Sequence, residues 1–372
     1  MQTCLVLGAG ATLANALHFH KRRMGGHNPP LDFTFFEKVA ALAITVPPEL
    51  KTYADAMAGG NPFVTEAGRP PLRMEEFFKE LFSDFQDAAP ASTTALAYEQ
   101  LVSLYTRVLR DTTDWIGEDN KMGGPVGRLI SDAVEASDRL SIITFNHDLV
   151  IENEIVKRAR LRRRWCIQHG YGGYSDTLRF TKPSSSTGSL FPEHSANCDH
   201  SKPIVVLKLH GSLNWYVQMV GSHPSRSILT GTNVSAHVHC TARRNVPHQF
   251  RYSRPVSTKK GRAHWYTWPV IIPPVHNKEA LIRNFVAPVW TEAAVAVSTS
   301  DLVIFVGYSL PTLDVGAERL FKRAIASNSN LKAVDVVNPS PDSAARYASI
   351  ATPKGVRWVH GIDRFLQNGP LA

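Results

Sequence analysis

Residues 4–12 read Cys4-Leu-Val-Leu-Gly8-Ala9-Gly10-Ala11-Thr12 and give the first indication of the fold. The apolar residues predict a short buried strand, the glycines end it, and a helix-compatible run follows from Thr12. A strand that turns at glycine into a helix presents backbone N–H groups at the helix N-terminus, where a phosphate binds favourably. The dinucleotide-binding fingerprint has a third small residue where this chain has Leu13. An ordinary strand-to-helix turn of an α/β protein is therefore the alternative interpretation.

Length and composition are those of an ordinary globular protein. The chain has 372 residues, enough for one large domain with insertions or for two domains. Apolar residues make up 43% and charged residues 20%, which argues against wholesale disorder. No apolar window is long enough to span a bilayer, and the N-terminus lacks the basic start and cleavage site of a signal peptide. We therefore expect neither a membrane segment nor a secretory leader.

The cysteines and histidines form no firm disulfide or metal pattern. Four cysteines are far apart and none belongs to a Cys-x-x-Cys pair, which argues against a disulfide framework or a zinc ribbon. Two clusters, His237-Val-His239-Cys240 and Cys198-x-His200, contain metal-ligand residue types but lack partners at a fixed spacing. We therefore predict a cytoplasmic protein with no bound metal.

Positive charge is concentrated in two segments. The formal net charge is +9, and lysines and arginines crowd residues 157–164 and 243–262. Such segments attract phosphates of nucleic acid or nucleotides, or an acidic partner protein. A solvated surface or an interface between subunits is the alternative. Nucleic-acid contact through these two segments is therefore a hypothesis.

A helical region is inserted after the first strand and helix. A helix is expected to begin near Asp32, and the Pro- and Gly-rich residues 47–71 predict a loop. From Met74 the apolar residues follow helical spacing, at positions 74, 77, 78, 81, 82 and 85. Further helices are predicted over 92–116 and 125–137. We interpret residues 33–138 as a helical insertion whose aromatic stripes form core.

An alternation of strands and helices then resumes. Strands are predicted at 140–145, 204–209, 270–272, 302–306, 333–337 and 356–359, with helices at 277–298, 313–327 and 340–350. Residues 165–200 are loop-like and residues 218–268 predict an irregular insert, both within a loop-rich basic region, 160–268. This pattern predicts an α/β fold: a Rossmann-like, mostly parallel sheet with helices on both faces, forming one domain over 1–372.

Polar or glycine-bearing residues follow five of the predicted strands. They are Gly8–Thr12, Asn146–Asp148, His210–Ser212, Gly307–Ser309 and Asn338. Ligands of such sheets bind outside the carboxyl ends of the strands, so we expect these residues to share one rim. Taken singly, each is equally explained as a turn or helix cap.

These motifs resemble those of the sirtuin family. Gly8-Ala9-Gly10-Ala11-Thr12 is similar to the family's Gly-Ala-Gly-Ala-Ser, and Thr144-Phe145-Asn146-His147-Asp148 resembles its Thr-Gln-Asn-Ile-Asp. His210-Gly211 resembles the catalytic His-Gly, and Gly307-Tyr308-Ser309 the later Gly-Thr-Ser. Asn338 matches the Asn that contacts the adenosine ribose. The resemblance extends over nearly the whole chain and implies NAD⁺ as substrate.

Departures from deacylating sirtuins imply a narrower group. The four-cysteine zinc module is absent between His210 and Gly307, and Asn28–Phe33 replaces the Gly-Ile-Pro-Asp-Phe-Arg loop. Pro-Pro-Leu, residues 209–215 and residues 307–314 look like the sirtuin-like NADase effectors of bacterial antiphage defence, which act by NAD depletion in abortive infection. The resemblance implies self-association into a homo-oligomer and pairing with a HerA-like ATPase.

Cleavage of the nicotinamide–ribose bond passes through an oxocarbenium-like state and releases a neutral leaving group. Asn146 is suited to orient a water or the ribose, and His210 to accept a proton. Asp148 is predicted to hold the sugar or nicotinamide side, with capping of the next helix as its alternative role. Phosphates are expected at Thr12, Ser309 and the glycine N–H groups.

Two nearby residues are predicted to lie outside the chemistry. Asp314 is expected to cap the helix after Pro311. His147 is expected to point away from its catalytic neighbours, because adjacent side chains of an extended segment alternate.

The leading hypothesis is an NAD⁺ glycohydrolase that acts as an antiphage effector and is restrained until a partner assembly is engaged. An NAD-dependent protein deacylase is a second hypothesis. A third is a sensor or structural subunit that binds NAD or ADP-ribose without turnover, and a fourth is a DNA-contacting subunit. The fold also accommodates oxidoreductases, but Leu13 breaks their usual fingerprint and no hydride-acceptor site is evident.

Overall fold

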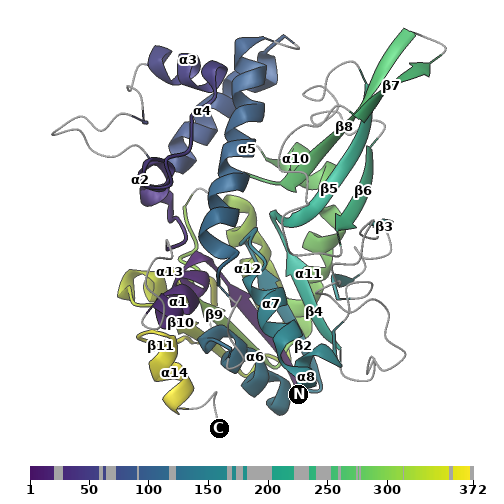
Figure 1. Cartoon of the computed structure of the whole chain (residues 1–372). Coiled ribbons are helices and arrows are strands. Elements are labelled where there is room, and N and C mark those ends of the chain that lie inside the picture. The colour runs from purple at the N-terminus through teal and green to yellow at the C-terminus, as the bar shows by residue number, and fades with distance from the viewer. Residues whose placement is uncertain are drawn as a thin grey trace, which may run out of the picture.

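The computed structural model describes residues 1–20, 28–57, 62–63, 73–89, 92–116, 123–165, 170–172, 179–181, 203–221, 234–239, 253–258, 261–273, 275, 278–312, 314–351 and 355–368. Figure 1 shows the elements they form.

A six-stranded sheet lies at the centre of the fold. Its strands are β1 (Gln2–Leu7), β2 (Arg139–Thr144), β4 (Ile204–Lys208), β9 (Leu302–Val306), β10 (Ala333–Val337) and β11 (Arg357–Val359). They run in the order β11-β10-β9-β1-β2-β4, and every neighbouring pair is parallel. This is the doubly wound order of Rossmann folds, and it reverses between β1 and β9. The predicted fold class is confirmed.

Two rows of helices cover the sheet. In the first row α1 (Ala9–His20), α7 (Val150–Lys157) and α14 (Ile362–Asn368) pack on α6 (Pro125–Ala136), which contacts β2. In the second row α12 (Val315–Ser327) packs between α11 (Ala287–Thr299) and α13 (Pro341–Ala351). Right-handed crossovers place such rows on opposite faces of the sheet. The helix predicted at 277–298 is two helices, because α10 (Glu279–Phe285) meets α11 at 93°.

The helical insertion stands above the carboxyl ends of the strands (Figure 1). It contains a 3-10 turn (Asp32–Thr34), α2 (Phe35–Ala41), α3 (Pro48–Ala56), α4 (Met74–Asp87) and α5 (Thr93–Thr113). The apolar residues predicted to line α4 are all buried. The loop prediction for 47–71 was wrong over α3, because Pro48 occupies the first turn of that helix, where no N–H is needed.

A second, five-stranded sheet replaces the predicted irregular insert at 218–268. Its order is β3-β6-β5-β8-β7, formed by β3 (Arg179–Thr181), β5 (Gly211–Gly221), β6 (Val234–His239), β7 (Ser253–Thr258) and β8 (Gly261–Ile271). The β5, β6, β7 and β8 pairings are antiparallel, and the strand predicted at 270–272 is the end of β8. Strand β3, which pairs in parallel with β6, lies inside the stretch predicted to be a loop. A short helix, α8 (Ala159–Arg162), follows α7.

One hydrophobic core joins these parts. Buried residues of the parallel sheet, the insertion and the second sheet belong to a single cluster. Tyr98 of α5 stacks on Trp268 of β8, with ring centroids 6.4 Å apart. The two substructures above the sheet are thus packed against each other.

Within the described ranges no single helix has both the length and the apolar character to cross a membrane. Only the bent pair α10 and α11 reaches them when the two helices are taken together.

Candidate active site

A cavity of about 570 Å³ opens at the carboxyl ends of the parallel strands, next to the reversal between β1 and β9. Its wall includes most of the residues that the sequence singled out: Ala9, Gly10, Thr12, Asn146, Asp148, His210, Gly307, Tyr308, Ser309 and Asn338. Gly8 and Ala11 are buried beneath it. The predicted convergence of strand ends on one rim is therefore present in the structure.

The glycines of the first turn allow two strand ends to approach closely. A Cβ on Gly8 would lie 2.6 Å from the carbonyl oxygen of Gly307, and one on Gly10 would lie 2.9 Å from the Gly307 Cα. The N–H groups of Gly8, Gly10 and Ala11 donate to carbonyls of Val306, Gly307 and Gly8 at 3.0, 3.0 and 2.9 Å. These three N–H groups are thus occupied, and the predicted phosphate cradle does not include them in this structure.

Asn146 has a fixed amide orientation. Its Nδ2 donates to the carbonyl of Gly8 and to Thr12 Oγ1, both at 2.9 Å. Because a carbonyl oxygen only accepts, the atom facing Gly8 must be the amide nitrogen. Both amide hydrogens are used, and within the described part of the chain Oδ1 has no donor. Asn146 therefore offers the cavity a hydrogen-bond acceptor.

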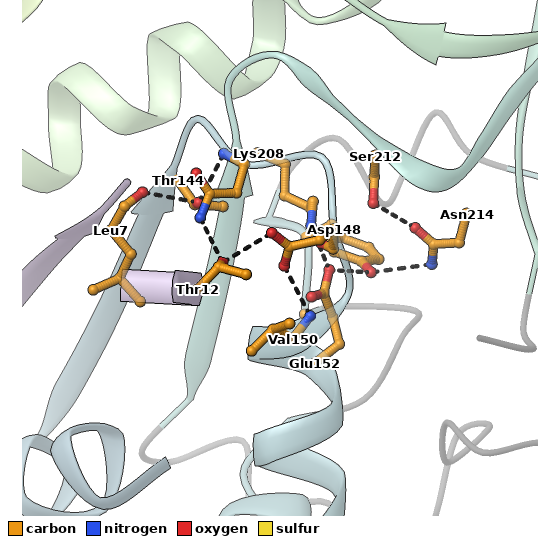
Figure 2. A network of polar contacts seen from close by, with 12 residues as sticks. Leu7, Thr12, Thr144, Asp148, Val150, Glu152, Lys208, Ser212 and Asn214 are labelled. Atoms are coloured by element: carbon orange, nitrogen blue, oxygen red, sulfur yellow. Dashed lines mark hydrogen bonds and ion pairs between the residues drawn. The ribbon is translucent and has the colours of Figure 1, made fainter. Parts of the chain in front are cut away.

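Thr12 and Asp148 hold that amide in place (Figure 2). The Thr12 hydroxyl donates to Asp148 Oδ2 at 2.9 Å, while Asp148 Oδ1 accepts the Val150 N–H at 3.0 Å at the start of α7. Asp148 thus takes the helix-capping role considered as its alternative. The single hydroxyl hydrogen of Thr12 is already directed at Asp148, so the expectation that Thr12 donates to a phosphate does not fit this arrangement.

A buried ion pair extends this network away from the cavity (Figure 2). Lys208 Nζ lies 3.1 Å from Glu152 Oε1, neither side chain is exposed, and Nζ also donates to the Asp148 carbonyl. Tyr171 donates to Glu152 at 3.0 Å and accepts from Asn214 Nδ2 at 3.2 Å. The loop after β2 is therefore tied to β4 and, through Asn214, to β5.

His210 lies in a buried cluster with a lysine and an aspartate. Lys278 Nζ is 3.0 Å from His210 Nε2 and 2.9 Å from Asp314 Oδ1. The Tyr308 hydroxyl donates to Asp314 Oδ2 at 3.0 Å. The capping role predicted for Asp314 was wrong: it stands at the N-cap position of α12, but its side chain makes no cap bond and serves this cluster instead.

The His210 ring is uncharged in this setting. Burial lowers its pKa well below the usual range, and the Lys278 ammonium and His147 lower it further. The 3.5 Å approach of Asp314 Oδ2 to Nε2 is therefore not an ion pair. Since an ammonium can only donate, Nε2 accepts from Lys278 and the ring proton lies on Nδ1.

His147 lies closer to the cavity than predicted. It contributes to the wall, and its ring stacks on His210 with centroids 6.1 Å apart. Nε2 lies 3.2 Å from the Ile272 carbonyl and must donate to it, so Nδ1 accepts from the Tyr105 hydroxyl at 3.0 Å. Burial lowers the pKa of His147 to about 3. Both ring nitrogens are engaged, so His147 is a wall residue with no free proton acceptor.

The turns after β9 and β10 form the opposite wall. Tyr308 stacks on Phe145 with centroids 4.1 Å apart and an interplanar angle of 5°, so its ring belongs to the core. Ser309 beside it is exposed on the rim. Asn338 is buried, and its Oδ1 accepts from the Ser340 N–H at 2.9 Å. Ser309 thus offers an accessible hydroxyl on this wall, as does the exposed Thr312.

The helical insertion supplies the roof of the cavity. Residues Pro29 to Phe33, Glu75 and Tyr105 line it. The Glu75 N–H donates to Asp32 Oδ1 at 2.8 Å at the start of α4. Burial, followed by the negative charge of Asp32, raises the pKa of Glu75 to about 7. A carboxyl group that titrates near neutrality therefore faces the cavity.

Sequence analysis missed Lys208, Lys278 and Glu75. A signal existed for Lys208, since a lysine inside the apolar run Ile204–Leu209 needs a buried partner. No such signal existed for Lys278 and Glu75, which stand next to polar residues in the sequence.

The basic segment 157–164 is partly occupied by contacts within the chain. Arg158 and Arg160 pair with Glu154 and Glu135, and Arg164 donates to the Val134 carbonyl. Nucleic-acid contact through this segment remains a hypothesis.

Several other predictions fall wholly or largely outside the described residues. These concern Cys166, Cys198, His200, Cys240 and most of the second basic segment, 243–262. Across the ranges that are described, no group of three or more His, Cys, Asp or Glu side chains is arranged to hold a metal ion.

No family model matches the chain, and no curated protein matches it. Among solved structures, one described as "Structural Basis for the Mechanism and Regulation of Sir2 Enzymes" is similar, with 13% identity, 98% of this chain and 89% of that chain covered, and a TM-score of 0.38. Another, "The Structural basis of Sirtuin Substrate Affinity", has 12% identity, 99% and 92% coverage and a TM-score of 0.36. At these scores the likeness adds no argument to the strand order and site geometry described above.

Proposed function

We propose that the protein is an NAD⁺ glycohydrolase, converting NAD⁺ and water into nicotinamide, ADP-ribose and a proton. The observation that carries the proposal is the pairing of an amide acceptor, Asn146 Oδ1, with an uncharged imidazole, His210, on the wall of one cavity at the switch point of a doubly wound sheet. The motifs that resemble those of sirtuins support it, since they contribute these same residues.

The reaction needs no general acid but depends on how the water and the ribose are positioned. The bond from ribose C1′ to the nicotinamide nitrogen breaks and the electron pair leaves with neutral nicotinamide, so no proton donor is needed. Water then forms the new C1′–O bond and loses one proton. Asn146 Oδ1 is suited to accept from that water or from a ribose hydroxyl, and His210 is suited to take up the proton.

The test is nicotinamide release from NAD⁺ by the purified chain, alone and with the product of the adjacent gene. Asn146→Ala and His210→Ala should each lower the rate, by about 10²-fold or more for the base. Asn330→Ala and His360→Ala are matched controls, because both residues are exposed and lie outside the cavity wall. Unchanged release by the two cavity variants would overturn the assignment of the site.

A second candidate is a subunit that binds NAD or ADP-ribose without turnover. One observation favours it: the Nε2 lone pair of His210 already accepts from Lys278. Binding of ADP-ribose by calorimetry, with no nicotinamide release under either condition, would support this candidate and refute the hydrolase.

The cellular role follows from the sequence resemblance alone. We propose that NAD depletion serves antiphage defence, in a homo-oligomer paired with a HerA-like ATPase. Cells that express the chain with its neighbouring gene should lose NAD⁺ on phage infection, and Asn146→Ala should abolish that loss. Infected cells that keep their NAD⁺ with the unaltered chain would refute this role.

A further inference from the structure

Lys278 stands between a base and an acid inside the cavity wall. It is buried, precedes α10, and places Nζ 3.0 Å from His210 Nε2 and 2.9 Å from Asp314 Oδ1. The proposed hydrolysis requires no ammonium at that point, because nicotinamide leaves without a proton. The proposed reaction therefore does not by itself explain why Lys278 contacts His210.

We propose that Lys278 is a positioning residue that keeps His210 uncharged, with the proton on Nδ1 and the Nε2 lone pair available for exchange. It does so by occupying Asp314 and by presenting its own positive charge to the ring. The catalytic consequence rests on the proposed function, whereas the effect on His210 rests on the geometry alone.

Without the lysine, Asp314 would be left as an unpaired carboxylate next to His210. Asp314 Oδ2 already lies 3.5 Å from His210 Nε2, so an unpaired carboxylate there would favour the imidazolium. With Lys278 present, the carboxylate is neutralised at 2.9 Å and the ammonium opposes protonation of the ring. The lysine thus turns a would-be acid–histidine ion pair into a neutral base.

The other titratable groups of the cavity do not supply this effect. His147 is uncharged and stacks on the ring, and the Tyr308 hydroxyl is bonded to Asp314. Asp148, on the loop after β2, is bonded to Thr12 and Val150. On other packed elements, Tyr105 of α5 is bonded to His147, Glu75 of α4 is directed at the cavity, and Lys208 of β4 is paired with Glu152. The charged residues Asp32, Arg73 and Arg346 also line the cavity; Asp32 accepts from the Glu75 N–H and lies 3.9 Å from Arg73. Lys278 is the cation in contact with His210 within the described residues.

The same contact sets a condition on ligand binding. A ribose hydroxyl that donates to His210 Nε2 must take the place of the Lys278 N–H, while the ammonium keeps its bond to Asp314. The Nε2 lone pair of His210 thus serves both to bind the hydroxyl and to accept its proton. It becomes available when its contact with Lys278 is broken.

The first arm of the test follows His210 directly, without catalysis. In protein with ¹³C-labelled histidine, the ring signals assigned by their loss in His210→Asn should titrate well below the usual range of an imidazole. In Lys278→Met the pKa of His210 should rise by at least about one unit, since one unit corresponds to 1.36 kcal/mol between protonation states. Lys278→Arg keeps the cation, so His210 should titrate in this variant as it does in the unaltered chain.

The double variant Lys278→Met with Asp314→Asn separates charge from packing. Removing the carboxylate as well should return the titration of His210 to its position in the unaltered chain, a result that a merely structural role of the lysine would not produce. Titration of Lys278→Met at the position of the unaltered chain would overturn the proposal. A double variant that titrates like the single one would do the same.

The second arm measures nicotinamide release. The acid limb of kcat/KM should move upward in Lys278→Met by the shift seen in the first arm, and should return in the double variant. An unmoved acid limb beside a shifted His210 would refute the catalytic consequence. Absence of release from every form, the unaltered chain included, would refute the proposed function while the first arm still decides the role of Lys278.

Discussion

Replacing Thr12 by valine tests the network that fixes Asn146. The substitution keeps the shape but removes a hydroxyl that donates to Asp148 Oδ2 and accepts from Asn146 Nδ2, both at 2.9 Å. A hydrogen bond to a carboxylate contributes about 1.5–3 kcal/mol and a neutral one about 0.5–1.5 kcal/mol. Thr12 is buried, so the groups left behind gain little water. We expect Thr12→Val to lower the free energy of unfolding by about 2–4 kcal/mol.

Thr106→Val is the matched control. Thr106 is equally buried, and its hydroxyl donates to the Val102 carbonyl of its own helix at 2.8 Å. Such back-bonding adds little to stability, so Thr106→Val should change the free energy of unfolding by less than about 1 kcal/mol. Thr12→Ser keeps the hydroxyl and should retain most of the stability that Thr12→Val loses.

Urea unfolding measures the stability term and nicotinamide release measures the functional one. The midpoint should fall for Thr12→Val with an unchanged denaturant slope. With one anchor of its amide gone, Asn146 should position its ligand less well, and kcat/KM should fall about tenfold or more, which corresponds to 1.36 kcal/mol in the barrier. Equal midpoints for the Thr12 and Thr106 variants would refute the reasoning, as would a serine variant no better than valine.

Three further predictions concern other parts of the site. Glu75 has a pKa of about 7 in the folded state, above its unfolded value, so its stabilising contribution is present at low pH and is lost as pH rises through 7. Ionised Glu75 places a negative charge on the cavity wall, so the affinity for anionic ADP-ribose, measured by calorimetry, should fall several-fold from pH 6 to 8. Glu75→Gln should remove this pH dependence and Glu99→Gln should not. An unaltered pH dependence in Glu75→Gln would refute the prediction. Gly307 has φ +61°, and a Cβ there would lie 2.3 Å from a backbone nitrogen. Gly307→Ala should therefore lower the free energy of unfolding by at least about 1 kcal/mol and weaken ADP-ribose binding. An unchanged midpoint of urea unfolding would contradict this. Lys208→Met leaves Glu152 as an uncompensated buried charge and should cost about 3–5 kcal/mol, whereas Lys208→Met with Glu152→Leu should recover much of it; no recovery counts against the ion pair as the cause.

The parallel sheet was predictable because most of its strands are short, largely apolar runs followed by a turn. The stripe of α4 was predictable for the same kind of reason, since its period of 3.6 is written locally. The second sheet was not, because the pairing of β5 and β8 joins positions about fifty residues apart. Sheet propensity depends on such neighbours more than on the strand itself.

The candidate site divides in the same way. Asn146 and His210 could be found because they directly follow strands, whose carboxyl ends meet by the rule of the fold. Lys278 and Glu75 come from outside the strand ends, and Lys278 meets His210 across 68 positions of sequence. Gly8 and Gly10 were singled out as part of a phosphate site, but in the structure they face the Gly307 backbone.

Asn146 and His210 are held in different ways, and this difference bears on how the site would work. Asn146 is fixed by the two hydrogen bonds that its Nδ2 donates, and Thr12, Asp148 and the buried Lys208 support it from behind. An apolar core would often be as stable as such a buried ionic network, so its value lies in holding one geometry. His210, by contrast, has its lone pair covered by a single contact that a hydroxyl can replace. If the proposed function holds, a rigid acceptor and an exchangeable base on the wall of one cavity would allow the sugar to be oriented first and the base to be uncovered only when a hydroxyl is in place.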